Sequence, residues 1–173
     1  MQTIECIRGR RSVRRYKEEK ISKGDIIEIL DAAAQAPSSG NVQDWEFIVV
    51  QKPETKLQLQ ETAMFGQKFI STASAIIVVC SNLDRMIIRY GERGKSLYSI
   101  QNTAAAAQNL MLAAWDKGFG TCWVGAFNEQ KVKDILILPT NVRPVAMITL
   151  GYPGETPDKK TVVELNKVVH WER

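Results

Sequence analysis

Arginines near the N-terminus are the first residues whose types and spacing could do chemistry. Arg10, Arg11, Ser12, Arg14 and Tyr16 follow one another within seven residues. Guanidinium groups bind phosphate oxygens in a bidentate way, and a serine hydroxyl adds a neutral donor. Residues 8–20 hold seven basic and two acidic side chains, so this segment carries +5 while the whole chain carries +4. The pattern predicts a phosphate-binding segment, and the alternatives are a solvated basic surface or a nucleic-acid contact.

A second group of polar residues follows a predicted helix. Hydroxyl and amide side chains, which suit the donor–acceptor edge of a heterocycle, are concentrated between two apolar segments. The members of this group are Pro37, Ser38, Ser39, Asn41, Gln43 and Trp45. The alternative is an ordinary helix-to-strand connection in which Trp45 fills the core.

Two later segments combine glycine with the end of a strand. In Trp123, Val124, Gly125 and Ala126, the small residues would let a ligand approach backbone N–H groups closely. The segment 150–155 reads as a strand that leaves into a turn, and two lysines follow it, Lys159 and Lys160. A strand end that needs small residues and a plain surface turn are the alternatives.

Several classes of site are nearly excluded by composition. The chain has one histidine, His170, near its end, which nearly excludes a Ser-His-Asp triad or a multi-histidine metal site. Its three cysteines are widely separated and form no CxxC pair that would suggest zinc. No GxGxxG follows a predicted strand and no Walker A lysine loop is present, which argues against a dinucleotide-binding Rossmann site. We expect no metal site. We also expect that the protein either uses a bound reagent for its chemistry or catalyses no reaction.

The elements that must position these residues are readable from periodicity. The 173 residues suit one domain, with 45% hydrophobic and 24% charged residues. No apolar run approaches the ~20 residues of a membrane span, and the N-terminus lacks signal-peptide features, so we expect a cytoplasmic protein. Helices are predicted around 4–13, 22–36, 53–63, 97–117 and 128–136, and strands at 46–50, 75–80, 120–127, 144–151 and 168–171.

Helices and strands do not alternate strictly, which favours the α+β class, or an irregular α/β order. Ser22 and Asp25 resemble a capping box, and Asn128 is placed to cap the next predicted helix. The charged segment 84–95 has no clear pattern.

Taken together, the order and spacing of these motifs resemble the nitroreductase family of FMN-dependent oxidoreductases, from Arg8 to Trp171. The chain looks like a small archaeal or bacterial-type member. The family's RRS-x-R-x-aromatic pattern is met by the first cluster, and its PSS-x-N-x-Q-P-W pattern by residues 37–45. One position departs from that pattern, because Asp44 stands where proline is usual. The departure leaves the pose of Gln43 open.

The resemblance implies an α+β fold with a central mixed, mainly antiparallel sheet flanked by helices, in which residues 1–173 form one FMN-binding domain. It also implies an intertwined homodimer with two FMN sites at the interface. The first cluster would hold the FMN phosphate and ribityl chain through Arg10, Arg11 and Ser12, and Arg14 would lie near the N1–C2=O edge of the flavin.

The remaining site residues are assigned by the same resemblance. The loop residues would come from one subunit and line the flavin of the other: Pro37, Ser38, Ser39, Asn41 and Gln43. Trp123, Val124, Gly125 and Ala126 would run along the ring, with the N–H near Gly125 bonded to flavin N5. Lys160, with Lys159, would reach the phosphate.

The activity implied by the resemblance is ping-pong hydride transfer from NADH or NADPH, through flavin N5, to a small-molecule acceptor such as a nitroaromatic or quinone. No side chain is expected to act as an acid–base catalyst. Other members of the family remove halogen or cleave the flavin, and these activities stay as alternatives. A non-catalytic nucleic-acid-binding module using residues 8–20 is disfavoured by the modest charge and scarcity of interleaved aromatics. We expect neither nucleic acid nor a membrane as a partner.

Overall fold

Four strands form one antiparallel sheet in the computed structural model, which describes residues 2–159 and 161–172. The strand order across the sheet is β1-β2-β4-β3. The strands are β1 (Trp45–Val50), β2 (Ala75–Asn82), β3 (Gly120–Val124) and β4 (Val142–Gly151). The helices in the described part of the chain are α1 (Thr3–Gly9), α2 (Lys23–Ala34), α3 (Pro53–Thr62), α4 (Phe69–Thr72), α5 (Leu83–Arg93), α6 (Ser99–Asp116) and α7 (Glu129–Leu136). Shorter turns are η1 (Ser39–Asn41), η2 (Met64–Gly66), η3 (Gly94–Tyr98) and η4 (Leu165–Lys167).

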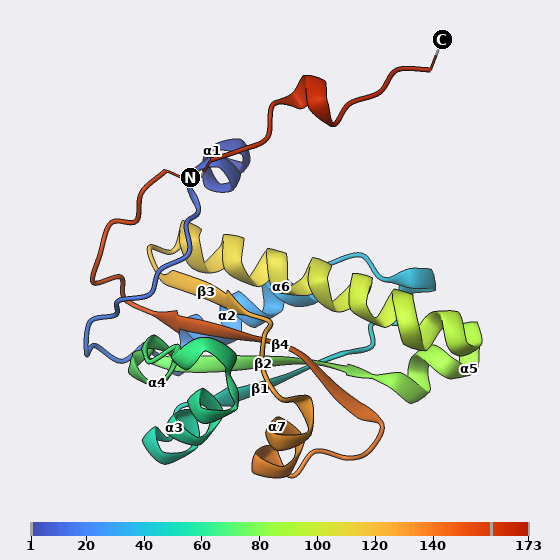
Figure 1. Cartoon of the computed structure of the whole chain (residues 1–173), viewed down its shortest axis with the longest axis horizontal. Helices are drawn as coiled ribbons and strands as arrows, with labels where there is room; N and C mark the ends of the chain where they lie inside the picture. The colour runs from blue at the N-terminus through green and yellow to red at the C-terminus, as the bar shows by residue number, and fades with distance from the viewer. Residues whose placement is uncertain (1, 160, 173) are drawn as a thin grey trace.

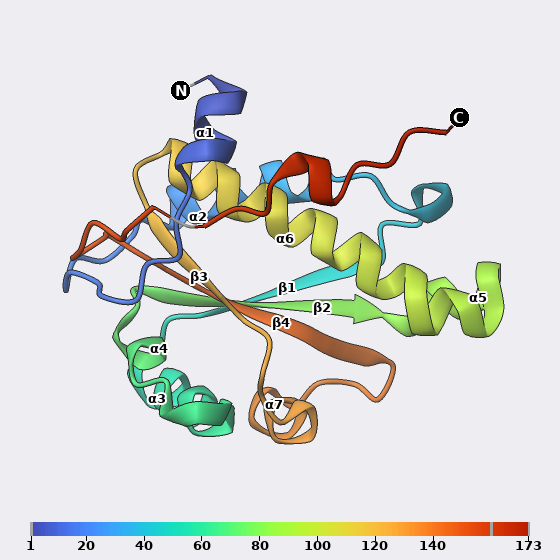
Figure 2. The same ribbon diagram turned by 45° about the horizontal axis from the view of Figure 1, so that its top comes forward.

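Helices cover both faces of the sheet. The helices α2 and α6 lie on one face, and α3, α4 and α7 lie on the other (Figure 1; Figure 2). Strand β2 is buried on both faces, because Ile77 and Val79 pack toward α2 and α6 while Ile76 and Val78 pack toward α3 and α7. This alternation follows from the period of two of a strand and explains its continuous apolar sequence. The predicted strand at 75–80 is thus confirmed.

Local capping signals begin two helices where the sequence predicts. The Ser22 hydroxyl accepts a hydrogen bond from the Asp25 N–H (3.0 Å) and donates one to the Asp25 carboxylate (2.6 Å). The Asn128 side chain likewise accepts from the Lys131 N–H at the start of α7. Both caps satisfy N–H groups that the first turn of a helix leaves without partners.

Two boundaries near the predicted site differ from the sequence predictions, and one segment without a clear pattern is helical. The first helix ends at Gly9, so the arginine segment that follows is extended rather than helical. Strand β3 ends at Val124, three residues earlier than predicted. The charged segment 84–95 forms most of α5, an exposed helix in which Met86 is buried.

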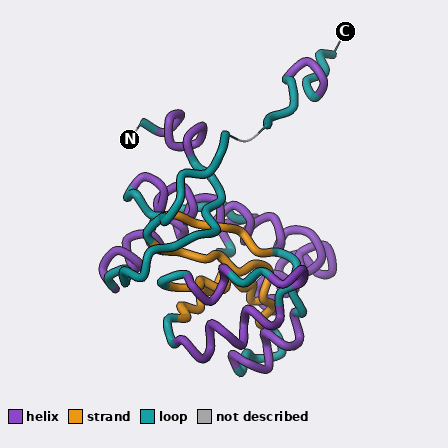
Figure 3. Tube along the Cα trace, turned by 60° about the vertical axis from the view of Figure 1, so that its left-hand side comes forward, coloured by secondary structure: helices purple, strands orange, loops and turns teal. Residues whose placement is uncertain are grey.

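The predicted strand at 168–171 is wrong. These residues follow the turn η4 and are exposed, and the described chain offers them no strand with which to pair. Isolated strand geometry has no hydrogen-bond partner and is not stable alone. Residues 161–172 instead extend away from the sheet and its helices (Figure 3), and their apolar side chains are exposed, with Trp171 86% accessible.

Among residues 2–159 and 161–172, none of the helices has the length and apolar character needed to cross a membrane.

Candidate functional site

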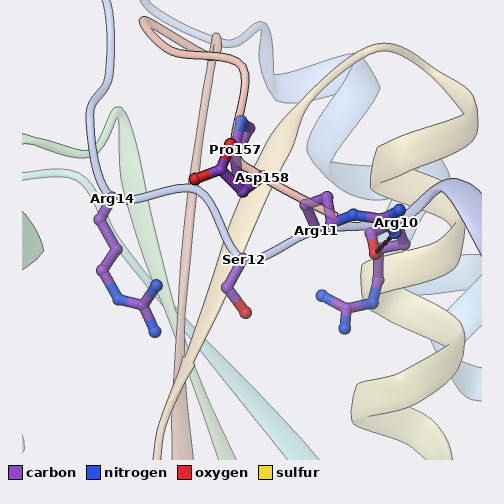
Figure 4. Close-up of a pocket in the computed structure, with 6 residues that line it drawn as sticks. All are labelled: Arg10, Arg11, Ser12, Arg14, Pro157 and Asp158. Atoms are coloured by element: carbon purple, nitrogen blue, oxygen red, sulfur yellow. Dashed lines mark hydrogen bonds between the residues drawn. The ribbon is translucent and has the colours of Figure 1, made fainter. Parts of the chain in front are cut away.

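A cationic pocket of about 350 Å³ lies beside the extended arginine segment. Its lining consists of Arg10, Arg11, Ser12, Arg14, Pro157 and Asp158 (Figure 4). The sequence predicted the first four. Pro157 and Asp158 were missed, although the resemblance already placed the neighbouring Lys159 and Lys160 near the phosphate; neither residue type marks a phosphate site by itself.

Backbone pairing holds the arginine segment against the sheet. Ser12 forms a parallel bridge with Thr121 of β3, and the Val13 N–H donates to the Thr121 carbonyl at 2.9 Å. Val13 is fully buried. Because side chains alternate along an extended segment, burying Val13 leaves its neighbours Ser12 and Arg14 on the pocket side.

Two further anchors come from the far end of the chain. The Tyr16 hydroxyl donates to the Val13 carbonyl (2.7 Å) and lies 2.6 Å from Thr149 Oγ1. Burial raises the pKa of Tyr16 well above its usual range, so this hydroxyl stays protonated. The Glu155 carboxylate accepts from the backbone N–H groups of Arg14 (2.6 Å) and Arg15 (3.1 Å).

The side chains around the pocket suit a phosphate. Three guanidinium groups and one hydroxyl are donors, against a single acidic lining residue, Asp158. Partial burial lowers the pKa of Arg10, and the nearby charge of Arg11 acts in the same direction. A bound anion favours the charged guanidinium and would offset this lowering. Such charge-assisted pairs are the strong hydrogen bonds of proteins.

The arginines differ in their present contacts. Arg11 uses Nη1 to donate to the carbonyls of Arg8 (2.7 Å), Gly9 and Arg10 (both 2.9 Å), and so caps the end of α1. The Arg14 guanidinium lies 5.9 Å from the ring centre of Phe69. Of the two predicted lysines, Lys159 is exposed and Lys160 lies outside the described residues.

The approach of this segment to β3 depends on a glycine. A Cβ added at Gly120 would lie 2.8 Å from Cβ and Cγ2 of Val13. We expect Gly120→Ala to lower the free energy of unfolding by about 1–3 kcal/mol, because buried and β-branched Val13 has little room to shift. Thermal or urea unfolding measures the change. Gly24→Ala is the control, since its nearest added contact is 3.7 Å and alanine favours the helix by up to about 1 kcal/mol. Equal stability of the two variants would contradict the packing described.

The segment predicted to run along the flavin continues from the pocket. Trp123, at the end of β3, and Gly125 are exposed, and Ala126 is partly exposed. The Val124 side chain, by contrast, packs in the core. Only the backbone of Val124 could therefore face a ligand.

The loop after α2 exposes two amide side chains, and the serines that precede them are half-buried. Asn41 and Gln43 are exposed, and both have left-handed backbone conformations with φ of 56° and 51°. The Gln43 side chain donates to Asn41 Oδ1 at 2.8 Å, and its N–H donates to the Ser38 hydroxyl at 3.0 Å. Pro37 is exposed and Ser38 and Ser39 are half-buried.

The loop and the arginine pocket of one chain lie at opposite ends of the sheet. Trp45, next to the loop, pairs with Ser81, whereas Thr121, beside the pocket, pairs with Leu150, which pairs with Ala75. From Ala75 to Ser81 the strand spans about 20 Å at ~3.3 Å per residue. Figure 1 and Figure 2 place the two ends accordingly. A single chain therefore brings the arginine segment beside β3 but does not bring the loop residues to the pocket.

Comparisons with known proteins give a consistent result. The sequence model of the nitroreductase family matches residues 7–66 and 56–152. A protein of Archaeoglobus fulgidus, whose provisional name is NADH dehydrogenase/NAD(P)H nitroreductase, is 38% identical over 161 residues, covering 90% of this chain and 87% of the relative. The FMN reductase (NADPH) of Bacillus subtilis is 28% identical over 181 residues, covering 97% of this chain and 72% of the relative.

A solved structure shares the same fold. Nitroreductase A from Vibrio parahaemolyticus superimposes with a TM-score of 0.90 at 29% identity, over 100% of this chain and 77% of that one. The family match spans most of the described sheet and helices, and it begins at the arginine segment. This chain therefore belongs to the nitroreductase family.

Proposed function

We propose that this protein is an FMN-dependent NAD(P)H oxidoreductase in which residues 1–173 form one FMN-binding domain. The single observation that carries the proposal is the pocket of arginines and Ser12, whose donor set suits the phosphate of FMN. Bound FMN would supply hydride acceptance and donation, which explains why a chain with one histidine needs no side-chain nucleophile. The names of two relatives, FMN reductase (NADPH) and oxygen-insensitive NADPH nitroreductase, support the same cofactors.

Each group of residues has a distinct task in this proposal. Arg10 and Ser12 bind the phosphate, and Arg11 holds the turn that presents them. Arg14 supplies positive charge that stabilises reduced flavin. The exposed backbone of residues 123–126 lies along the ring, and Lys159 or Lys160 adds charge near the phosphate. The nicotinamide and the acceptor use one site in turn, in a ping-pong order.

We further propose that the working unit is an intertwined homodimer. The loop with Asn41 and Gln43 lies about 20 Å along the sheet from the arginine pocket, and a twofold axis would place it against the pocket of a second copy. The extended segment 161–172 is the second observation in favour of a dimer. Its apolar side chains are exposed in the single chain, and packing against a second copy would bury them. A cytoplasmic location stays a prediction from the sequence.

The test is direct. Purified protein should be yellow or become yellow on addition of FMN, elute as a dimer of the 19.4 kDa chain, and oxidise NADH or NADPH when a nitroaromatic or quinone is supplied. A screen of acceptors that includes halogenated aromatics and oxygen separates reduction from dehalogenation and flavin cleavage. A colourless monomer that takes up no FMN, and binds RNA with a steep dependence on salt, would refute the proposal.

A further inference from the structure

A buried carboxyl group lies directly behind the loop that carries Asn41 and Gln43. Asp44 is fully buried. Its Oδ2 accepts a hydrogen bond from the Ser81 hydroxyl at 2.5 Å, and its Oδ1 accepts one from Asn102 Nδ2 at 2.6 Å. Its carbonyl also accepts from the Asn82 N–H at 2.7 Å. Asp44 thus joins the start of β1 to both β2 and α6.

Asn102, which is hydrogen-bonded to Asp44, is also hydrogen-bonded to Ser39 in the loop. Its Oδ1 accepts from the backbone N–H of Ser39 at 2.9 Å and from the Ser39 hydroxyl at 3.2 Å. A backbone N–H can only donate, so Oδ1 must face Ser39 and Nδ2 must face Asp44. The side chain at position 44 therefore has to be an acceptor. Proline, usual here in the motif, could not complete this network.

The loop between these anchors needs support. Asn41 and Gln43 each hold a left-handed backbone, which is unfavourable for a residue with a Cβ and more so for Gln43 than for Asn41. Such conformations persist only when their surroundings fix them. Arg89 and Arg85 of α5 also donate to the carbonyls of Gly40 (2.7 Å) and Gln43 (3.0 Å), but both arginines are exposed. The buried anchor is the Asp44 network.

We propose that Asp44 is a positioning residue, which acts through Asn102 and Ser39 to set the pose of the Asn41 and Gln43 amides at the flavin of the partner subunit. This role rests on the proposed function, because that proposal puts the two amides against the flavin. Asp44 itself touches no ligand, since its side chain is wholly enclosed by the described residues around it. Its contribution is the geometry of the loop.

Two single substitutions break the link from position 44 to the loop. In Asp44→Leu, the Asn102 amide N–H₂ loses its carboxylate acceptor and keeps only a weak one, Met86 Sδ at 3.6 Å. In Asn102→Asp, two carboxyl groups meet at the 2.6 Å contact. They repel when both are ionised, so the hydrogen bond between them can form only if one takes up a proton, which is unfavourable at neutral pH. The first change therefore leaves a buried donor without a strong acceptor, and the second places two buried acceptors against each other.

Exchanging the carboxylate and the amide between positions 44 and 102 should restore the hydrogen bond between them. In the double variant D44N/N102D, the carboxylate at position 102 accepts from Ser39 and from the new amide N–H₂ at position 44. The amide oxygen at position 44 then accepts from Ser81. The hydrogen bonds to Ser39 and to Ser81, and the one between positions 44 and 102, are then all re-formed. The single variant D44N also keeps the link, because its amide can turn its oxygen to Asn102 and its N–H₂ to the Ser81 hydroxyl.

The experiment measures FMN dissociation constants by fluorescence, and hydrogen exchange of the peptide containing Ser39 by mass spectrometry. D44L and N102D should each bind FMN about ten-fold more weakly and exchange faster, as expected for a mismatched buried donor or acceptor. The double variant should recover both values to within about two-fold. Ser81→Ala is the control, because it removes one hydrogen bond of Asp44 and leaves the link to Ser39 intact. It should lower stability with little change in FMN affinity, and D44N should resemble it.

The outcomes separate the possibilities. Recovery in the double variant supports the positioning role, even if a single variant fails to fold. A folded double variant that still binds FMN weakly, or a D44L variant with unchanged affinity and exchange, overturns it. Affinity that falls equally in S81A and N102D, in step with stability, also overturns it, because a merely structural role would do the same. Wild-type protein that binds no FMN would refute the proposed function instead, and hydrogen exchange would still test whether Asp44 holds the loop.

Discussion

Co-expression of two inactive variants is expected to restore about one quarter of wild-type activity per subunit, as a symmetric dimer with shared sites requires. The first variant, Arg10→Glu, places a negative charge in the phosphate pocket. The second, N41G/Q43G, removes both loop amides while glycine accepts the left-handed backbone at each position. Each homodimer then has two defective sites.

The mixed dimer differs because the two lesions fall on the same site. One site combines both defects, and the other combines an intact pocket with an intact loop. Random pairing makes about half of the dimers mixed, with one good site in two, which gives the expected quarter. Differently tagged chains, purified through both tags, should raise this to about one half.

The control for this experiment is a pair of variants in the same half of the site. Co-expressed R10E and Ser12→Ala chains should not complement beyond the sum of their separate activities, because neither supplies an intact pocket. If R10E and N41G/Q43G fail to complement in verified mixed dimers, the shared site is refuted. Full activity of either variant alone would equally remove its residues from the site.

The second large effect concerns the phosphate itself. We expect Arg10→Ala to weaken FMN binding about 10–100-fold, because a hydrogen bond between charged groups contributes about 1.5–3 kcal/mol. Binding of riboflavin, which lacks the phosphate, should be almost unchanged. Fluorescence titration of both flavins measures the difference directly.

Arg15→Ala is the matched control for Arg10→Ala. It removes the same charge from the same segment, but Arg15 is exposed and does not line the pocket. Its effect on FMN should be slight and should disappear at higher salt, as for any surface charge. Equal losses of FMN and riboflavin affinity in R10A would mean that the arginine supports the fold rather than the phosphate.

Much of the fold is readable from short segments. The caps at Ser22 and Asn128 and the doubly buried strand β2 depend on neighbouring residues or on simple periodicity, so the sequence predicts them. The arginine segment was predicted to be partly helical, yet it pairs with residues more than 100 positions away, at Thr121 and Pro153. Local propensity cannot anticipate such partners.

The candidate site likewise contains residues that the sequence predicts and residues that it does not. Motif spacing identified the pocket arginines and the loop amides, but not Asp158 in the lining or Asn102 behind the loop. Asp44 was visible only as a departure from a pattern, and its reason needs the positions of Ser81 and Asn102. The strand expected at 168–171 failed because strand pairing needs a partner that the described chain does not supply.

The pocket joins two segments that lie far apart in the sequence. Arg14 and Arg15 are held by Glu155, and the Lys17 N–H donates to the Tyr152 carbonyl. During synthesis on the ribosome, the arginines emerge about 140 residues before the segment that completes their pocket, which at 5–20 residues per second is a delay of roughly 7–30 s. The nascent chain must keep a strongly basic, unpaired segment in solution throughout this interval. The complete pocket therefore cannot form before this later segment has been synthesised.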